Sequence, residues 1–365
     1  MKNVLISLGQ RSYNIAIGSG ILDRAGALLA ELPLGKKALL VTNPAVGDLY
    51  AARVENSLAQ AGFRVFRAQI PDGEQYKSLQ SAATLYDRAF AAGLDRSCPV
   101  VALGGGVVGD LGGFAAATYM RGVPLVQIPT TLLAQVDSSV GGKVAVNHPR
   151  GKNIIGAFYQ PVLVLSDTET LRTLAGREVR SGLAEVIKYG VIRDGRFFGW
   201  LEKNIGKVLA LDPEALAHVV ETSCRVKAAV VEEDETEQGT RAILNLGHTV
   251  GHAVESLTYY TDCNHGEAVA MGMATATRLA VQLGLCQAGE EKRVNELLHK
   301  AGLPLQIPGK LDPHEMIKAM ARDKKAYGGE ITFILPKTVG EVIIKNNISE
   351  TDIVKAVQAC QGQNL

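Results

Sequence analysis

Three histidines stand close together in the second half of the chain, and their spacing points to metal chemistry. His248 and His252 are four residues apart in the segment LGHTVGHA, so a helix would place both on one face, as in two-histidine metal sites. His265 follows at the start of the next predicted helix. One such residue alone would more often cap a helix or fill a core, but a cluster of three favours a metal ion.

A carboxylate is a sensible third ligand, because a mononuclear catalytic metal has three protein ligands and one open position. Glu185 is a candidate, since it lies in the apolar segment SGLAEVIK and would be costly to bury without a cation. The sequence therefore predicts a metal site that combines imidazoles with one carboxylate.

A glycine-rich turn, LGGGVVGD at residues 103–110, follows a predicted strand and opens a helical segment. Gly104, Gly106 and Gly109 satisfy the pattern G-x-G-x-x-G, in which backbone N–H groups approach a pyrophosphate at a helix N-terminus. The turn lies beyond the first strand–helix unit, and no acidic residue ends the next strand, unlike the usual dinucleotide fingerprint. Phosphate binding and close packing of small residues both remain open explanations.

Basic and amide side chains recur along the chain, often beside glycine. Lysines near open backbone can hold a phosphate or a carboxylate, although a single lysine is most often a solvated surface charge. The candidates are Lys143, Lys152, Asn153, Lys188, Lys227, Arg241, Asn245, Lys324 and Lys325.

The elements that must position these residues alternate between strand and helix in the first half of the chain. We expect strands over residues 4–8, 13–17, 37–42, 63–70, 99–103 and 125–128, and helices over 21–32, 48–61 and 79–92. Such alternation predicts an α/β domain with a mostly parallel sheet, whose ligands bind at the carboxyl ends of the strands.

Helical patterns dominate after residue 166. We expect helices over residues 179–191, 213–233, 246–257, 267–283, 290–301 and 313–322, and a hairpin over 330–335 and 339–345. The predicted domains are therefore 1–165, with an α/β fold, and 166–365, mainly α-helical.

The bulk composition excludes some classes of function. The chain of 365 residues has 38 basic and 37 acidic residues and a net charge of +1, which argues against a general nucleic-acid-binding protein. The five cysteines are scattered and never paired as C-x-x-C, as in a reduced cytoplasmic protein. The first residues lack the apolar core of a signal peptide, and no apolar stretch is long enough to span a bilayer, so we expect a cytoplasmic protein without a membrane partner.

Taken together, these segments resemble the 3-dehydroquinate synthases, a family of sugar-phosphate cyclases. The resemblance covers about residues 72–336 and rests on an ordered series of motifs. They are DGEQYK at 72–77, residues 104–114, YMRG at 119–122, IPTTLLAQVD at 128–137, GGK at 141–143, GKN at 151–153, residues 182–188, residues 241–252, HGE at 265–267 and DKK at 323–325. One departure is LAGRE at 174–178, where the family often has proline after the leucine, so Ala175 should relax a local turn.

The resemblance implies an N-terminal domain with a Rossmann-like NAD site and a helical C-terminal domain that holds zinc, or alternatively cobalt, with the substrate in the cleft. Glu185, His248 and His265 would be the metal ligands, and His252 would face the substrate instead. The NAD site would be lined by Asp72, Gly73, Glu74, Gln75, Tyr76, Lys77, Gly105, Gly106, Val107, Val108, Gly109, Asp110, Thr130, Thr131, Lys143, Lys152, Thr170, Leu171, Arg172 and Thr173.

The resemblance also implies a set of residues for the substrate. Contacts would come from Arg121, Lys143, Asn153, Lys188, Lys227, Arg241, Asn245, His252, His265 and Lys325. Arg121 would reach the phosphate pocket of a neighbouring subunit, because these enzymes are usually homodimers. Catalysis would involve Lys143, Lys188, Arg241, Asn245, His252, Asp137 and Glu237, the last two by orienting lysines and waters.

The implied reaction converts 3-deoxy-D-arabino-heptulosonate 7-phosphate to 3-dehydroquinate and phosphate, the second step of the shikimate pathway. It combines oxidation of the C5 hydroxyl, elimination of phosphate, reduction, ring opening and aldol closure, so NAD is regenerated in each turnover. Another sugar-phosphate cyclase, acting on glucose 6-phosphate or sedoheptulose 7-phosphate, is one alternative. A metal-dependent alcohol dehydrogenase of the glycerol dehydrogenase type is a second, and it would release NADH. A dinucleotide sensor without catalysis would not explain the metal residues.

Overall fold

The computed structural model describes residues 1–259, 261–325 and 331–362 and divides into two compact units. The first unit contains Met1–Leu174 and Leu216–Thr236, and the second contains Ala175–Ala215 and Glu237–Leu365. The sequence predicts a single division between residues 165 and 166. Here the first unit instead continues to Leu174 and includes most of helix α8 (Pro213–Glu233).

A seven-stranded sheet forms the centre of the first unit, in the order β1-β2-β9-β6-β5-β3-β4. Its neighbouring strands are parallel except for β1 and β2, where Ile6 lies opposite Tyr13 in an antiparallel pair. This arrangement confirms the predicted mostly parallel sheet. The strands are β1 (Lys2–Ile6), β2 (Tyr13–Gly18), β3 (Lys37–Thr42), β4 (Arg64–Gln69), β5 (Val100–Gly104), β6 (Leu125–Pro129) and β9 (Leu163–Asp167).

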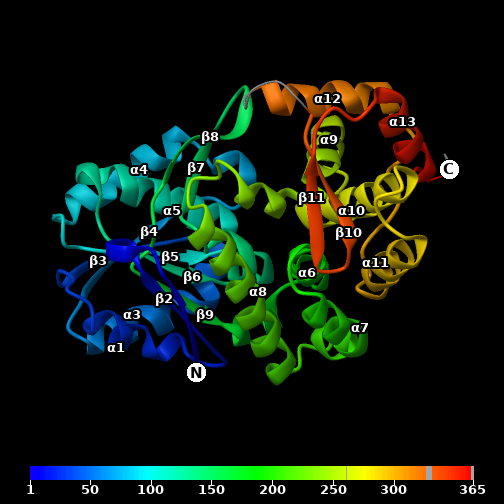
Figure 1. Ribbon diagram of the computed structural model, residues 1–365. Coiled ribbons are helices and arrows are strands. Elements are labelled where there is room, and N and C mark those ends of the chain that lie inside the picture. The colour runs from blue at the N-terminus through cyan, green and yellow to red at the C-terminus, as the bar shows by residue number, and fades with distance from the viewer. Residues whose placement is uncertain (260, 326–330, 363–365) are drawn as a thin grey trace. The chain divides into compact units, whose positions relative to one another are not determined.

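Helices cover both faces of this sheet and bury its apolar side chains (Figure 1). Successive residues of β5 point to opposite cores: Val100 belongs to one hydrophobic cluster and Val101 to the other. The first cluster includes residues of α4 (Leu79–Ala91) and α5 (Gly106–Thr118), and the second includes residues of α1 (Ala25–Ala30) and α3 (Ala52–Gln60). A strand buried on both faces reads as a continuous apolar run, as β3 and β5 do.

A second small sheet in this unit was not predicted. β7 (Lys143–His148) and β8 (Gly151–Phe158) form an antiparallel hairpin, in which Val144 and Val146 are buried in the same cluster as α4 and α5.

The predicted helices over residues 21–32 and 48–61 are shorter in the structure, and each is preceded by a short helical turn. The short turns are η1 (Gly9–Arg11), η2 (Leu22–Arg24), α2 (Pro44–Val46), η3 (Gly47–Ala51), η4 (Glu74–Tyr76), η5 (Tyr119–Arg121), η6 (Ala134–Ser138) and η7 (Thr168–Thr173).

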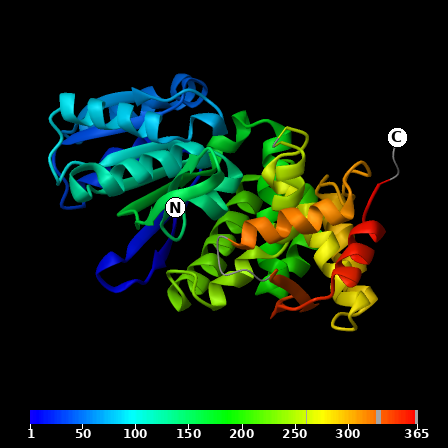
Figure 2. The same ribbon diagram turned by 90° about the horizontal axis from the view of Figure 1, so that it is seen from above.

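The second unit is mainly helical, as the sequence predicts. Its elements are α6 (Gly176–Ile192), α7 (Gly195–Leu209), η8 (Thr240–Asn245), α9 (His248–Leu257), α10 (His265–Gln282), α11 (Ala288–Lys300), α12 (Pro313–Lys325), β10 (Phe333–Thr338), β11 (Glu341–Lys345) and α13 (Glu350–Ala359). Helices α7 and α13 were not predicted, and Glu330 of the predicted hairpin lies outside the described residues. Figure 2 shows α12 in orange and α13 in red side by side.

Helix α10 forms the core of this second unit. Most of its residues are buried, and it packs against both α6 and α9. It also packs against α13, so segments as far apart in sequence as α6 and α13 meet around one helix. In the described part of the chain, no helix combines the length and the apolar character needed to span a lipid bilayer.

Candidate active site

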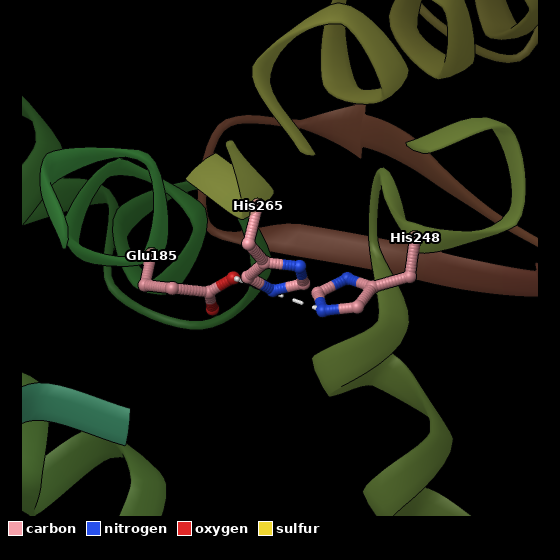
Figure 3. Close-up of side chains that lie close together, drawn as sticks. All are labelled: Glu185, His248 and His265. Carbon is pink, nitrogen blue, oxygen red and sulfur yellow. Dashed lines mark ion pairs between the residues drawn. The ribbon is translucent and has the colours of Figure 1, made fainter. Parts of the chain in front are cut away.

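A buried carboxylate and two imidazoles meet in the second unit (Figure 3). Glu185 on α6 is fully buried, and Nε2 of His248 and Nε2 of His265 each lie 3.7 Å from its Oε1. The centroids of the two imidazole rings are 5.3 Å apart. One ligand atom from each of the three residues lies within 4.8 Å of the others. A zinc ion bonded to nitrogen and oxygen at about 2.0–2.2 Å can bridge atoms at this spacing.

The local sequence explains how His248 and His265 reach this position. Gly247 adopts φ +83° just before α9, a left-handed conformation that glycine accepts without strain, and His248 is the first residue of the helix. His265 is the first residue of α10, which begins with a capping box. Asn264 accepts from the N–H of Glu267 at 3.0 Å, and the Glu267 carboxylate accepts from the N–H of Asn264 at 3.0 Å.

A glycine holds the start of α10 against α6. The N–H of Gly266 donates to Oγ of Ser181 at 3.0 Å, and a side chain at position 266 would overlap the backbone of Ser181. This close approach brings His265 to the helix face that carries Glu185.

The protonation of the two imidazoles differs. Burial, reinforced by the nearby ammonium of Lys188, lowers the pKa of His248 to about 3. Burial also opposes a charge on His265, but the nearby carboxylates of Glu185 and Glu255 outweigh it and raise the pKa of His265 to about 10. Two imidazoles and a buried carboxylate form a donor set that fits a divalent cation, which would take the place of the His265 proton.

Two other predicted residues of the second unit, Lys188 and His252, lie beside this group. Lys188 is 1% exposed and forms an ion pair with Glu185 one turn earlier on α6. The ring of His252 lies 5.3 Å from that of His248 and 6.3 Å from that of His265, measured between centroids. Arg241 is also buried, and it lies in η8, the turn that leads to α9.

Two further predicted residues of this unit contact each other. Nδ2 of Asn245 donates to Oε1 of Glu237 at 2.9 Å. Glu237 therefore contacts an amide, and its expected role of orienting lysines and waters stays a prediction. The side chain of Lys325 lies outside the described residues.

In the first unit, the predicted cofactor residues gather at the carboxyl ends of neighbouring parallel strands. The glycine-rich turn joins β5 to α5, Thr130 and Thr131 follow β6, and residues 170–173 lie in η7 after β9. This edge is where open parallel sheets bind their ligands. A Cβ added to Gly105 would come within 3.1 Å of the side chain of Thr131. The backbone of the turn therefore lies close to Thr131 and leaves little room for a side chain.

The start of α5 supports dinucleotide binding. Gly105 is its N-cap residue and brings no side chain of its own, so the first N–H groups can face an anion. Asp72 lies beyond β4, and its Oδ1 accepts from Nδ2 of Asn43 at 2.7 Å. The groups that fit a pyrophosphate here are therefore the backbone N–H groups at the start of α5, at the edge of the sheet.

Lys77 connects three of the predicted segments. It is 3% exposed, and its ammonium bonds to Oδ2 of Asp110 at 2.5 Å and to Oδ1 of Asn153. Burial raises the pKa of Asp110, even though Lys77 opposes this shift. Asn147, which the sequence analysis does not single out, donates to Oε1 of Glu74 at 2.7 Å. These contacts tie the DGEQYK segment to α5 and to the β7–β8 hairpin.

Lys227 on α8 is a nearly buried ammonium in the first unit. It donates to the backbone oxygen and to Oδ1 of Asp137, both at 2.7 Å. An aspartate that orients a lysine is what the sequence analysis expects of Asp137. Arg121, Lys143 and Lys152 are exposed in the same unit.

Glu255, which the sequence patterns did not indicate, lies on α9 beside the candidate metal ligand His265. His252, Glu255 and His265 form a second group of possible ligand atoms within 4.8 Å of one another. Helical spacing could have found this residue, because positions 248, 252 and 255 lie on one face.

Comparison with known proteins gives consistent results over the length of the chain. Models of the 3-dehydroquinate synthase N-terminal and C-terminal regions match residues 67–181 and 182–326. The 3-dehydroquinate synthase of Pelotomaculum thermopropionicum is 57% identical over 362 residues, covering 99% of this chain and 98% of that protein.

Two solved structures of sugar cyclases are also similar. The 2-epi-5-epi-valiolone synthase from Streptomyces hygroscopicus subsp. jinggangensis 5008, with NAD+ and Zn2+ bound, is 29% identical, with a TM-score of 0.89 and coverage of 97% of this chain and 98% of that one. A 2-deoxy-scyllo-inosose synthase, complexed with carbaglucose-6-phosphate, NAD+ and Co2+, is 28% identical, with a TM-score of 0.87 and coverage of 98% and 100%.

Proposed function

The chain belongs to the 3-dehydroquinate synthase family, and from this premise we propose how its own residues share the work of the reaction. The enzyme is a carbon–oxygen lyase that converts 3-deoxy-D-arabino-heptulosonate 7-phosphate to 3-dehydroquinate and phosphate, the second step of the shikimate pathway. The roles of individual residues, the metal and the assembly are proposals.

Glu185, His248 and His265 are proposed to hold a divalent cation. The observation that carries this assignment is that Oε1 of the fully buried Glu185 lies 3.7 Å from Nε2 of His248 and 3.7 Å from Nε2 of His265. When bound, the ion supplies a Lewis acid that polarises the C5 oxygen of the substrate. Zinc is the proposed ion and cobalt the alternative, since related cyclases bind NAD+ with Zn2+ or with Co2+.

The carboxyl ends of β5, β6 and β9 are proposed to hold NAD+, which supplies the hydride acceptor and donor for C5. The N-terminus of α5 would bind the pyrophosphate through its backbone N–H groups. The buried ion pair of Lys77 and Asp110 would hold the DGEQYK segment in place beside that helix. The remaining cofactor contacts are proposed from the residues that the family resemblance implies.

Buried cations are proposed to bind the anionic ends of the substrate. In the second unit these are Lys188 and Arg241, each 1% exposed, and in the first unit Lys227, which Asp137 orients. A charge-assisted hydrogen bond is roughly twice as strong as a neutral one, so these groups fix the carboxylate and the phosphate in position. His252 and Asn245 would hold or move protons at the hydroxyl groups.

The remaining proposals concern the surroundings of the enzyme. We propose a homodimer in which Arg121, exposed as the last residue of η5, reaches the phosphate site of the neighbouring subunit. A cytoplasmic location is proposed because all five cysteines are free, as in reduced compartments.

The test is phosphate release measured together with NADH. Purified enzyme, NAD+ and Zn2+ should release inorganic phosphate from 3-deoxy-D-arabino-heptulosonate 7-phosphate with no net absorbance of NADH. Sedoheptulose 7-phosphate and glucose 6-phosphate serve as parallel substrates. Phosphate release from one of these alone would assign another cyclase activity, and accumulation of NADH would assign an alcohol dehydrogenase.

A further inference from the structure

His265 lies between two carboxylates, one at each ring nitrogen. Its Nε2 is 3.7 Å from Oε1 of Glu185, and its Nδ1 is 3.5 Å from Oε1 of Glu255. Glu255 is 5% exposed, and its position on α9 is one turn beyond His252 and two turns beyond His248. A carboxylate buried this deeply is costly unless it is paired, and the imidazole of His265 is one partner.

We propose that Glu255 is a positioning residue, which orients His265 for metal binding without touching the ion. This inference rests on the proposed metal centre of Glu185, His248 and His265. A carboxylate at Nδ1 keeps the proton on that nitrogen, so Nε2 presents its lone pair toward Glu185. Such an outer carboxylate also fixes the ring plane and increases the basicity of the ligand nitrogen.

The other imidazole has the same arrangement with a different acceptor. Nδ1 of His248 faces the backbone oxygen of Leu246 at 3.2 Å, which leaves its Nε2 directed at Glu185. Both ligands thus have an acceptor at Nδ1, one from the backbone and one from a side chain. A substitution can remove only the side-chain acceptor, so Glu255 is the position to test.

A rival assignment makes Glu255 a metal ligand itself, together with His252 and Nδ1 of His265. A neutral imidazole has one N–H and one lone pair, so an ion on each nitrogen would require His265 to lose both protons. With the ion at Nε2, the remaining proton stays on Nδ1 and is donated to Glu255. Positioning therefore predicts one ion per chain, and the rival predicts two.

The experiment compares Zn2+ affinity by competition with a chromogenic chelator, using full-length protein stripped of metal. We expect Glu255→Gln to weaken binding about tenfold and Glu255→Leu about 100-fold, the range seen when outer partners of metal ligands are removed. The matched control is Glu291→Gln, because Glu291 is 6% exposed and pairs with Arg278 at 2.9 Å on a different helix. It should lose stability without losing zinc affinity.

The outcomes separate this inference from the proposed function. If Glu185→Ala abolishes zinc binding while both Glu255 variants bind as the wild type does, only the role of Glu255 is overturned. If wild-type protein binds no zinc, or Glu185→Ala binds it normally, the metal centre itself is wrong. Two ions per wild-type chain would overturn positioning in favour of ligation. Where Glu255→Leu does not fold, Glu255→Gln decides alone: tenfold weaker binding supports the role, and unchanged binding overturns it.

Discussion

Lys188 and Glu185 form a buried ion pair within one turn of α6, and neither side chain is more than 2% exposed. The ammonium therefore lies beside the carboxylate that is proposed to hold the metal. Lys188 and a divalent cation are both positive and repel each other. The ammonium therefore makes binding of the cation at this carboxylate less favourable. The pair links a proposed substrate contact to the metal centre.

Lys188→Met should have opposite effects on zinc affinity and on turnover. We expect Zn2+ affinity to rise, by about tenfold, because a competing charge is removed, while turnover falls because a proposed anion-binding group is lost. Stripped of metal, the variant should also melt at a lower temperature, since removing one partner of a buried pair leaves the other uncompensated.

Chelator competition and phosphate release measure these two changes, and melting curves with and without zinc measure the third. Lys203→Met, which removes an exposed lysine of α7, is the control and should change none of them. Weaker zinc binding by Lys188→Met would contradict the argument.

His248→Ala should abolish both metal binding and turnover. The substitution removes one of the three proposed ligands, and an alanine offers no replacement donor. Metal analysis of the purified protein should fall from one ion per chain to none, with a matching loss of phosphate release. His299→Ala, at an exposed position on α11, should keep both. Full activity of His248→Ala would refute the assignment of His248.

The sequence could predict part of this centre but not all of it. Local spacing indicates His248 and His252, because both lie on one helix. His265 reaches Glu185 through the packing of α10 on α6, where Gly266 meets Ser181, and no local pattern encodes that contact. The sequence included His265 in the histidine cluster, only the family resemblance separated His252 from the proposed ligands, and neither route found Glu255.

The fold shows the same division between local and tertiary information. Helix α8 was predicted with its correct ends, but not its place in the first unit, where Lys227 contacts Asp137 far away in sequence. Helix α7 was missed because its glycines weaken the helical signal, while the burial of Phe198 and Leu201 stabilises it. The β7–β8 hairpin was missed because β8 exposes most of its residues and lacks a clear alternation.

Ala175→Pro should stabilise the protein. Ala175 has φ −58° and ψ 139°, which a proline ring accepts, and Leu174 before it is extended at φ −78° and ψ 138°. The gain comes from the unfolded chain, which loses conformational freedom, and is about 0.4–1 kcal/mol. This corresponds to a rise in melting temperature of about 1–3 °C. Because Ala175 is exposed, activity should not change, and a lower melting temperature would show that the backbone there does not tolerate proline.

Cys224 should resist alkylation in the native enzyme. Its thiol donates to the backbone oxygen of Gln135 at 3.3 Å, and burial raises its pKa to about 12. A raised pKa keeps the group as a thiol, and only the thiolate is nucleophilic, so reaction stays slow throughout pH 7 to 9. Iodoacetamide labelling followed by peptide mass spectrometry should find Cys224 unmodified in native protein and modified in guanidinium chloride. Cys263, which is partly exposed, should be labelled faster, and equal rates for the two cysteines would mean that α8 opens readily from the first unit.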